Sequence, residues 1–131
     1  MHVLRINASP RYKRDDITSY LLVSEDTCDS KNLTITIVEM EPGGIQHVHS
    51  HEPEQMYYIM EGSGLMTVDD EQQQVEAGEC IFFSSFSRHG LENTGGTVLR
   101  YLSAASPSFK KDDSRKLWPL KSLDEEGKGR R

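Results

Sequence analysis

Two histidines separated by a single residue, His49 and His51, constrain this chain more than any other feature of its sequence. Side chains alternate along a β-strand, so residues two apart on an extended segment point to the same face. Both imidazoles can therefore reach one metal ion. Gln55 follows a turn at Pro53, and the alternation then resumes on a new strand, so its amide oxygen can approach the same point. A fourth candidate, His89, follows a distant apolar run.

The segments around these residues resemble the two sequence motifs of the cupin family. Residues 43–62 match the first motif, which is a Gly, five residues, His-x-His, three residues, an acid, six residues and a Gly, except that Gln55 replaces the acid. Residues 78–93 match the second motif, which is a Gly, five residues, Pro-x-Gly, two residues, His, three residues and Asn. Ser84 and Phe86 stand at its usual Pro and Gly positions.

The resemblance covers residues 33–102, most of a domain of the usual size, and implies a double-stranded β-helix, or jelly-roll barrel. The residue pattern alone also favours an all-β class, because about ten short strands with turns between them and no long helix are typical of a sandwich or barrel. We expect one domain, with an N-terminal arm over residues 1–16, the barrel over 17–106 and a polar C-terminal tail over 107–131. The tail is too polar to build core, but three of its apolar residues could dock on the barrel: Leu117, Trp118 and Leu120.

The resemblance implies that the metal ligands are His49, His51, Gln55 and His89. Imidazole suits Zn, Cu, Fe or Ni, whereas oxygen ligands suit harder ions such as Mn, so this set leaves the divalent transition metal unidentified. Glu54 is a rival ligand, but strand parity turns it away from the ion. Neutral Gln55 in place of Glu leaves the divalent charge uncompensated, which favours an anionic ligand such as a carboxylate or enolate.

Three further residues are candidate catalytic or pocket-lining groups: Tyr57, His47 and Arg100. Tyr57 faces inward by parity, and either donates a hydrogen bond to a substrate or packs in the core. His47 shares the strand parity of the ligand pair, so it either moves protons at the pocket wall or lies in solvent at the strand's entry. Arg100 either projects into the barrel and clamps a carboxylate, or lies in water with Leu99 and Tyr101 inside.

These features favour a metal-binding cupin that binds or acts on a small anionic carbohydrate or organic acid, with isomerase-like or lyase-like Lewis-acid chemistry. Two alternatives stay open, a metal-dependent dioxygenase and a non-catalytic cupin that binds or senses a small ligand.

Composition argues against other classes of partner. A net charge of -6, with no cluster of Lys and Arg, disfavours nucleic acid. No run of about 20 apolar residues occurs, so we expect neither a membrane span nor a signal peptide. Cys28 and Cys80 are too few for a disulfide scaffold, and we expect reduced thiols, with Cys80 buried, in a cytoplasmic protein.

The strand that begins at Gln55 has two apolar faces. If Gln55 faces the interior, the outward set is Met56, Tyr58 and Met60. Because exposed apolar patches usually mark interfaces, we expect a homodimer that covers this face. The alternative cover is the chain's own N-terminal arm or C-terminal tail.

Overall fold

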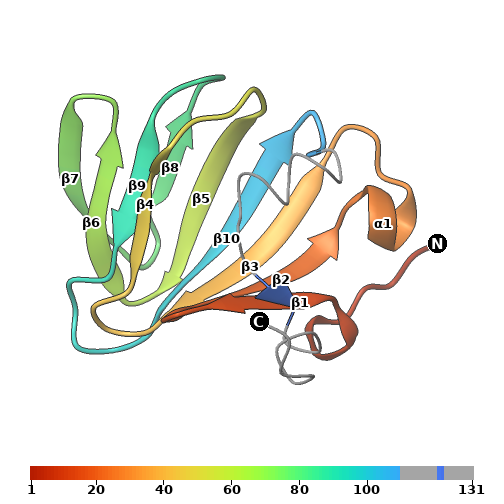
Figure 1. The fold of residues 1–131 in the computed structure, drawn as a ribbon, viewed down its shortest axis with the longest axis horizontal. Helices are drawn as coiled ribbons and strands as arrows, with labels where there is room; N and C mark the ends of the chain where they lie inside the picture. The colour runs from red at the N-terminus through yellow and green to blue at the C-terminus, as the bar shows by residue number, and fades with distance from the viewer. Residues whose placement is uncertain (110–120, 123–131) are drawn as a thin grey trace.

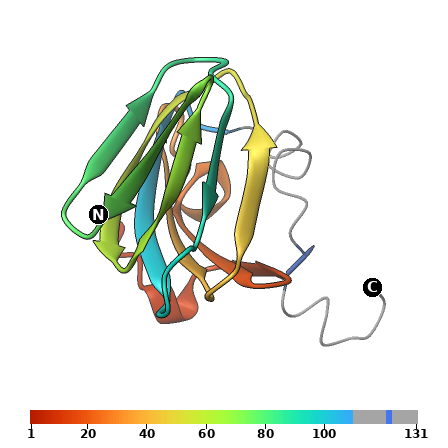
Figure 2. The same cartoon turned by 90° about the vertical axis from the view of Figure 1, so that its left-hand side faces the viewer.

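The computed structural model describes residues 1–109 and 121–122, which form two antiparallel β-sheets packed as a jelly-roll barrel (Figure 1, Figure 2). The larger sheet has the strand order β11 (Lys121–Ser122), β1 (Arg11–Arg14), β2 (Ile17–Val23), β3 (Thr34–Met40), β10 (Leu99–Ser106), β5 (Glu54–Glu61) and β8 (Cys80–Phe83). The smaller sheet has the order β4 (Ile45–His49), β9 (His89–Glu92), β6 (Ser63–Val68) and β7 (Glu71–Glu76). In Figure 1 strands β5, β10, β3, β2 and β1 of the larger sheet follow one another toward the right, β8 lies to the left of β5, and β6 and β7 stand at the far left.

The described helices are short: a 3-10 turn, η1 (Ile6–Ala8), and one α-helical turn, α1 (Glu25–Cys28). Neither is long or apolar enough to cross a membrane. The expected all-β jelly roll is therefore confirmed. Strands β6 and β7 form a hairpin. Its two-residue connection begins at Asp69, which has a φ of 51°. Asp tolerates this left-handed conformation better than most residues, which suits a tight hairpin turn.

The core lies between the two sheets and consists of inward-facing side chains from both. Its buried apolar members are Val38, Met40, Tyr57, Ile59, Met66, Val75, Phe83, Leu91, Leu99 and Tyr101. Complete burial of one such side chain is worth roughly 1.5–3 kcal/mol. Tyr57 and Tyr101 are both fully buried, and their ring centroids lie 4.3 Å apart. The aromatic pair therefore links β5 to β10 inside the barrel.

Strand β3 turns its threonines, not its isoleucines, toward the core. Val38 and Met40 are core residues and share their strand face with Thr34 and Thr36, all four of which are buried. Ile37 therefore lies on the outer face, where it is flanked by Tyr20 and Leu102 of the neighbouring strands. The inner face of β3 therefore carries two buried hydroxyl groups beside its apolar side chains.

The two ends of the chain differ from the sequence-based expectation. Part of the segment expected to be an arm forms β1, because the turn at Asp15 pairs it with β2 and the Arg11 guanidinium lies 5.4 Å from the centroid of the Tyr20 ring. At the other end, the expectation of no core beyond Pro107 is wrong, since Phe109 is only 5% exposed. The three apolar tail residues suggested to dock lie outside the described residues.

We expect Gly64→Ala to destabilise the fold. A Cβ at Gly64 would lie 2.5 Å from the carbonyl oxygen of Glu92 and 3.0 Å from Cδ2 of Leu99, so two strands would have to separate. Overpacking of this kind typically costs about 1–3 kcal/mol. Urea unfolding should show a lower midpoint for Gly64→Ala. The control is Gly96→Ala, because a Cβ there meets no atom within 4 Å. Equal midpoints for the two variants would contradict the packing argument.

Candidate metal centre

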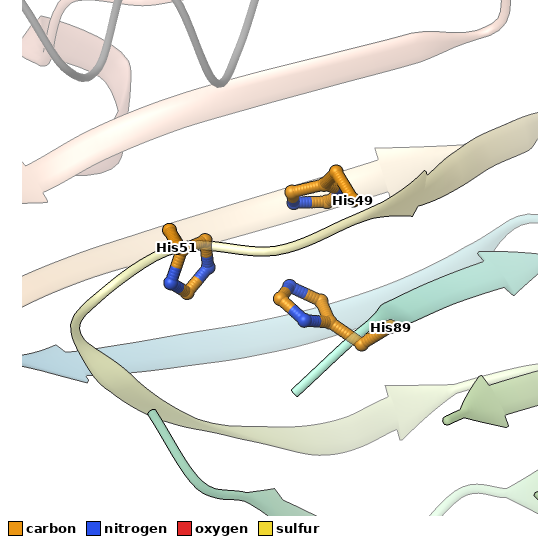
Figure 3. Close-up of side chains that lie close together, drawn as sticks. All are labelled: His49, His51 and His89. Carbon is orange, nitrogen blue, oxygen red and sulfur yellow. The ribbon is translucent and has the colours of Figure 1, made fainter. Parts of the chain in front are cut away.

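Three imidazoles from two chain segments lie together inside the barrel (Figure 3). His49 ends β4, His51 lies in the connection that follows, and His89 begins β9. Because β4 pairs with β9, His49 lies directly opposite His89. One ligand nitrogen from each ring lies within 4.8 Å of the others. The sheet register therefore brings together residues that are far apart in the sequence.

Backbone carbonyl groups fix the orientation of all three rings. The contacts join Nδ1 of His49 to the carbonyl oxygen of His47 (2.9 Å), Nδ1 of His51 to that of Pro53 (2.9 Å) and Nδ1 of His89 to that of Ser87 (3.0 Å). A carbonyl oxygen only accepts hydrogen bonds, so each Nδ1 carries the proton and donates it. Each Nε2 is left with a lone pair, as in imidazoles that bind metal ions.

Burial keeps these rings neutral. It lowers the pKa of His49 and is the largest cause of the lowered pKa of His51. Burial, followed by repulsion from His49, lowers the pKa of His89 to about 3. The His89 side chain is buried completely, and its Nε2 has no hydrogen-bond partner among the described residues. A buried polar atom without a partner is costly, so this nitrogen needs a partner such as an ion.

Gln55 adds an oxygen to the group. It is buried on the inner face of β5, and its Nε2 donates to Oγ of Ser103. Its Oε1 lies 2.8 Å from Nε2 of His51, although both of these atoms carry lone pairs. The contact requires either a cation against both atoms or the amide turned over, so that its NH2 donates to the ring. Glu54 is exposed and lies on the other strand face, as expected.

The donor set fits a divalent transition metal ion. It offers three imidazole nitrogens and one amide oxygen, all neutral, which suits Zn, Fe, Ni or Cu and tolerates Mn. Two aromatic rings hold the imidazoles in place. Phe83 stacks on His89 with ring centroids 4.0 Å apart, and Phe109 meets His51 edge-on at 4.8 Å.

A strained turn supports the same region. Phe86 occupies the second motif's usual Gly position and has a φ of 64°, a left-handed conformation that is unfavourable for a bulky residue. Its backbone N–H donates to the carbonyl oxygen of His51 at 2.8 Å. The turn therefore ties the segment before His89 to the segment that carries His51.

The remaining candidates lie in different places. Tyr57 faces inward, with its ring centroid 6.3 Å from that of His89. His47 is exposed, because a bulge between Gln46 and His49 shifts the alternation of β4. Of the two places considered for it, the solvent-exposed one is therefore adopted.

Arg100 lies on the outer face of β10. Its Nε is 3.3 Å from Oε2 of Glu39, whereas Leu99 and Tyr101 are fully buried. Of the two registers considered for this strand, the one that keeps Arg100 out of the barrel is adopted, and the carboxylate clamp is excluded.

Sequence reasoning missed three residues close to the site and misplaced a cysteine. Ser103 could have been found from the inward register of Tyr101, but Phe109 stands alone in a polar segment, and the bulge that turns Gln46 inward left no recognisable signal. Cys80 is exposed on β8, so its expected burial is wrong.

Known proteins share the sequence motifs and the fold. The family model described as "Cupin domain" matches residues 36–105. An uncharacterized protein of Methanocaldococcus jannaschii is 33% identical over 84 residues, which are 64% of this chain and 66% of that protein. An oxalate-binding protein of Thermotoga maritima is 31% identical over 83 residues, which are 63% of this chain and 69% of that protein.

A solved structure described as a predicted oxalate decarboxylase, also from Thermotoga maritima, superposes with a TM-score of 0.73 and 24% identity over 81% of this chain and 99% of that chain. At this identity the superposition shows the shared fold alone. Because the family model matches more than half of the chain, the protein belongs to the cupin domain family.

Proposed function

We propose that this cupin binds a divalent transition metal ion through Nε2 of His49, His51 and His89, with Oε1 of Gln55 as the fourth ligand. The observation that carries this proposal is the set of three Nδ1 contacts to backbone carbonyls, which leaves a lone pair on each Nε2 of a close group whose His51 and His89 are buried and whose His49 is half-buried. Neutral rings that present lone pairs to each other are unfavourable without a cation. A bound ion removes this cost.

We propose further that the site holds a small organic acid or anionic carbohydrate. The four ligands carry no charge, and no Asp, Glu, Lys or Arg is buried among the described residues. An anion inside the barrel would therefore be stabilised mainly by the ion, which would supply Lewis-acid polarisation of an acid oxygen. The name of the Thermotoga relative, an oxalate-binding protein, supports an acid of this kind.

The reaction that we propose is isomerase-like or lyase-like chemistry with limited proton transfer; binding without turnover is the second candidate, and a separate observation favours it. Burial raises the pKa of Tyr57, so its hydroxyl keeps its proton and acts as a donor. The absence of a buried carboxylate or lysine among the described residues leaves only weak bases near the site, which favours the binding role.

The first test compares two histidines on one strand. We expect His49→Ala to weaken metal affinity on the order of a hundredfold or more, since loss of an outer partner alone costs roughly 10–100-fold. His47→Ala is the matched control, because His47 is exposed on the same strand. Elemental analysis after dialysis against a weak chelator measures occupancy. Equal metal content in both variants would refute the proposed ligand set.

The second test changes the charge of the site. We expect Gln55→Glu to retain the metal but bind oxalate at least about tenfold more weakly, because a negative charge at about 4 Å costs up to about 4 kcal/mol at an effective dielectric constant of 20. Isothermal titration calorimetry on the metal-loaded protein measures this affinity. Tighter oxalate binding by Gln55→Glu would contradict the charge argument.

We also propose that a second copy of the chain covers the outer face of β5 and β8. Three large apolar side chains on these strands are exposed: Tyr58 (43%), Met60 (36%) and Phe82 (63%). Exposed apolar patches usually mark interfaces, and a second copy of the chain would bring the same apolar patch against this one, with Glu54 at its margin.

The third test concerns this face. Light scattering should give the wild-type protein twice the chain mass of 14.9 kDa, and the Tyr58→Glu/Phe82→Glu double variant the chain mass itself. The carboxylates should dissociate the dimer because they would be buried against each other without partners. Gln73→Glu on the exposed part of β7 controls for added charge. A wild-type monomer would refute the dimer.

A further inference from the structure

Gln46 lies inside the barrel and is held there by two tyrosines. Its Oε1 accepts hydrogen bonds from the hydroxyl groups of Tyr57 at 2.9 Å and Tyr101 at 3.4 Å. Burial raises the pKa of both phenols, so both remain donors. The carbonyl end of the amide is thereby fixed, and its NH2 group has no acceptor among the described residues.

The position of Gln46 relates it to the candidate metal centre. Gln46 and His49 both face inward from β4, on either side of the bulge. Three residues along an extended strand span roughly 10 Å, and a bulge shortens this distance. Tyr57 bridges the interval, since its hydroxyl contacts Gln46 and its ring lies 6.3 Å from that of His89. Gln46 is half-buried, whereas the two tyrosines are fully buried, and its Nε2 is not among the buried side-chain atoms without a partner, so this nitrogen is accessible to solvent.

We infer that Gln46 is a specificity-determining residue, whose NH2 group donates to the distal polar group of an acid that is anchored at the metal centre by its other end. This inference rests on the proposed function. The ligand it selects is an acid with a second carboxylate or hydroxyl several carbons from the first. A group placed to donate a hydrogen bond discriminates against ligands that leave it without an acceptor.

A purely structural role for Gln46, in which it only accepts hydrogen bonds from the two phenols, predicts a different result. Loss of such a role would loosen the barrel and weaken the binding of all acids alike. Loss of a distal donor would instead weaken a long diacid and spare a short one. The ratio of the two affinities therefore separates these roles.

The experiment measures oxalate and glutarate binding by isothermal titration calorimetry, on the full chain with its metal content verified by elemental analysis. We expect the wild-type protein to bind both acids. Gln46→Met, which keeps the side-chain length but removes the amide, should weaken glutarate binding by about tenfold, the scale of one hydrogen bond, and change oxalate binding by less than about twofold.

Gln46→Glu is the second variant, and it keeps an oxygen acceptor for both phenols. It replaces the NH2 group with an oxygen, so it should also weaken glutarate binding more than oxalate binding, even if Gln46→Met folds poorly. Equal losses for the two acids, or unchanged glutarate binding in both variants, would overturn the inference and leave the proposed function intact. A metal-loaded wild-type protein that binds neither acid would overturn both.

Discussion

The antiparallel pairing of β4 with β9 is the contact on which the site depends. It sets His49 opposite His89 and thereby joins the two sequence motifs in space. The connection from β4 to β5 then carries His51 and brings Gln55 in from the larger sheet. Both sheets therefore contribute donor atoms, and the packing of the barrel around Tyr57 and Tyr101 is also what keeps those atoms together.

The orientation of the imidazoles comes from the backbone, not from charged side chains. In many metal sites a carboxylate accepts the outer histidine proton and makes the ring more basic. Here three carbonyl groups accept these protons, at distances of 2.9–3.0 Å. The rings are oriented without adding negative charge to the interior. The neutral Gln55 has the same effect as the carbonyl acceptors. Neither adds a negative charge that would compensate the charge of a bound ion.

Strand alternation predicted an all-β class, the shared face of His49 and His51 and the inward position of Gln55. The jelly-roll fold and the clustering of His89 with the other imidazoles were implied by the resemblance to the cupin motifs. The sequence could not predict the irregularities. The bulge in β4 exposes His47 and turns Gln46 inward, and no residue type marks it. The sequence did not determine which face of β10 points inward, because the strand alternates equally well with Arg100 inside or with Leu99 and Tyr101 inside. Phe109 was missed because a single aromatic residue in a polar segment carries no periodicity. The metal, the acid and the dimer remain predictions.

Because the interior of the barrel lacks charged side chains, the residue at position 55 has a large effect on the electrostatic potential there. With no Asp, Glu, Lys or Arg buried among the described residues, the electrostatic potential within the barrel would depend mainly on the proposed ion and on the side chain at position 55. Exchange of Gln55 for Glu would lower the formal charge of the proposed divalent ion and its ligands by one unit, to a single positive charge, while leaving the imidazoles in place. Cupins of this kind can therefore come to bind different small molecules without any change of fold.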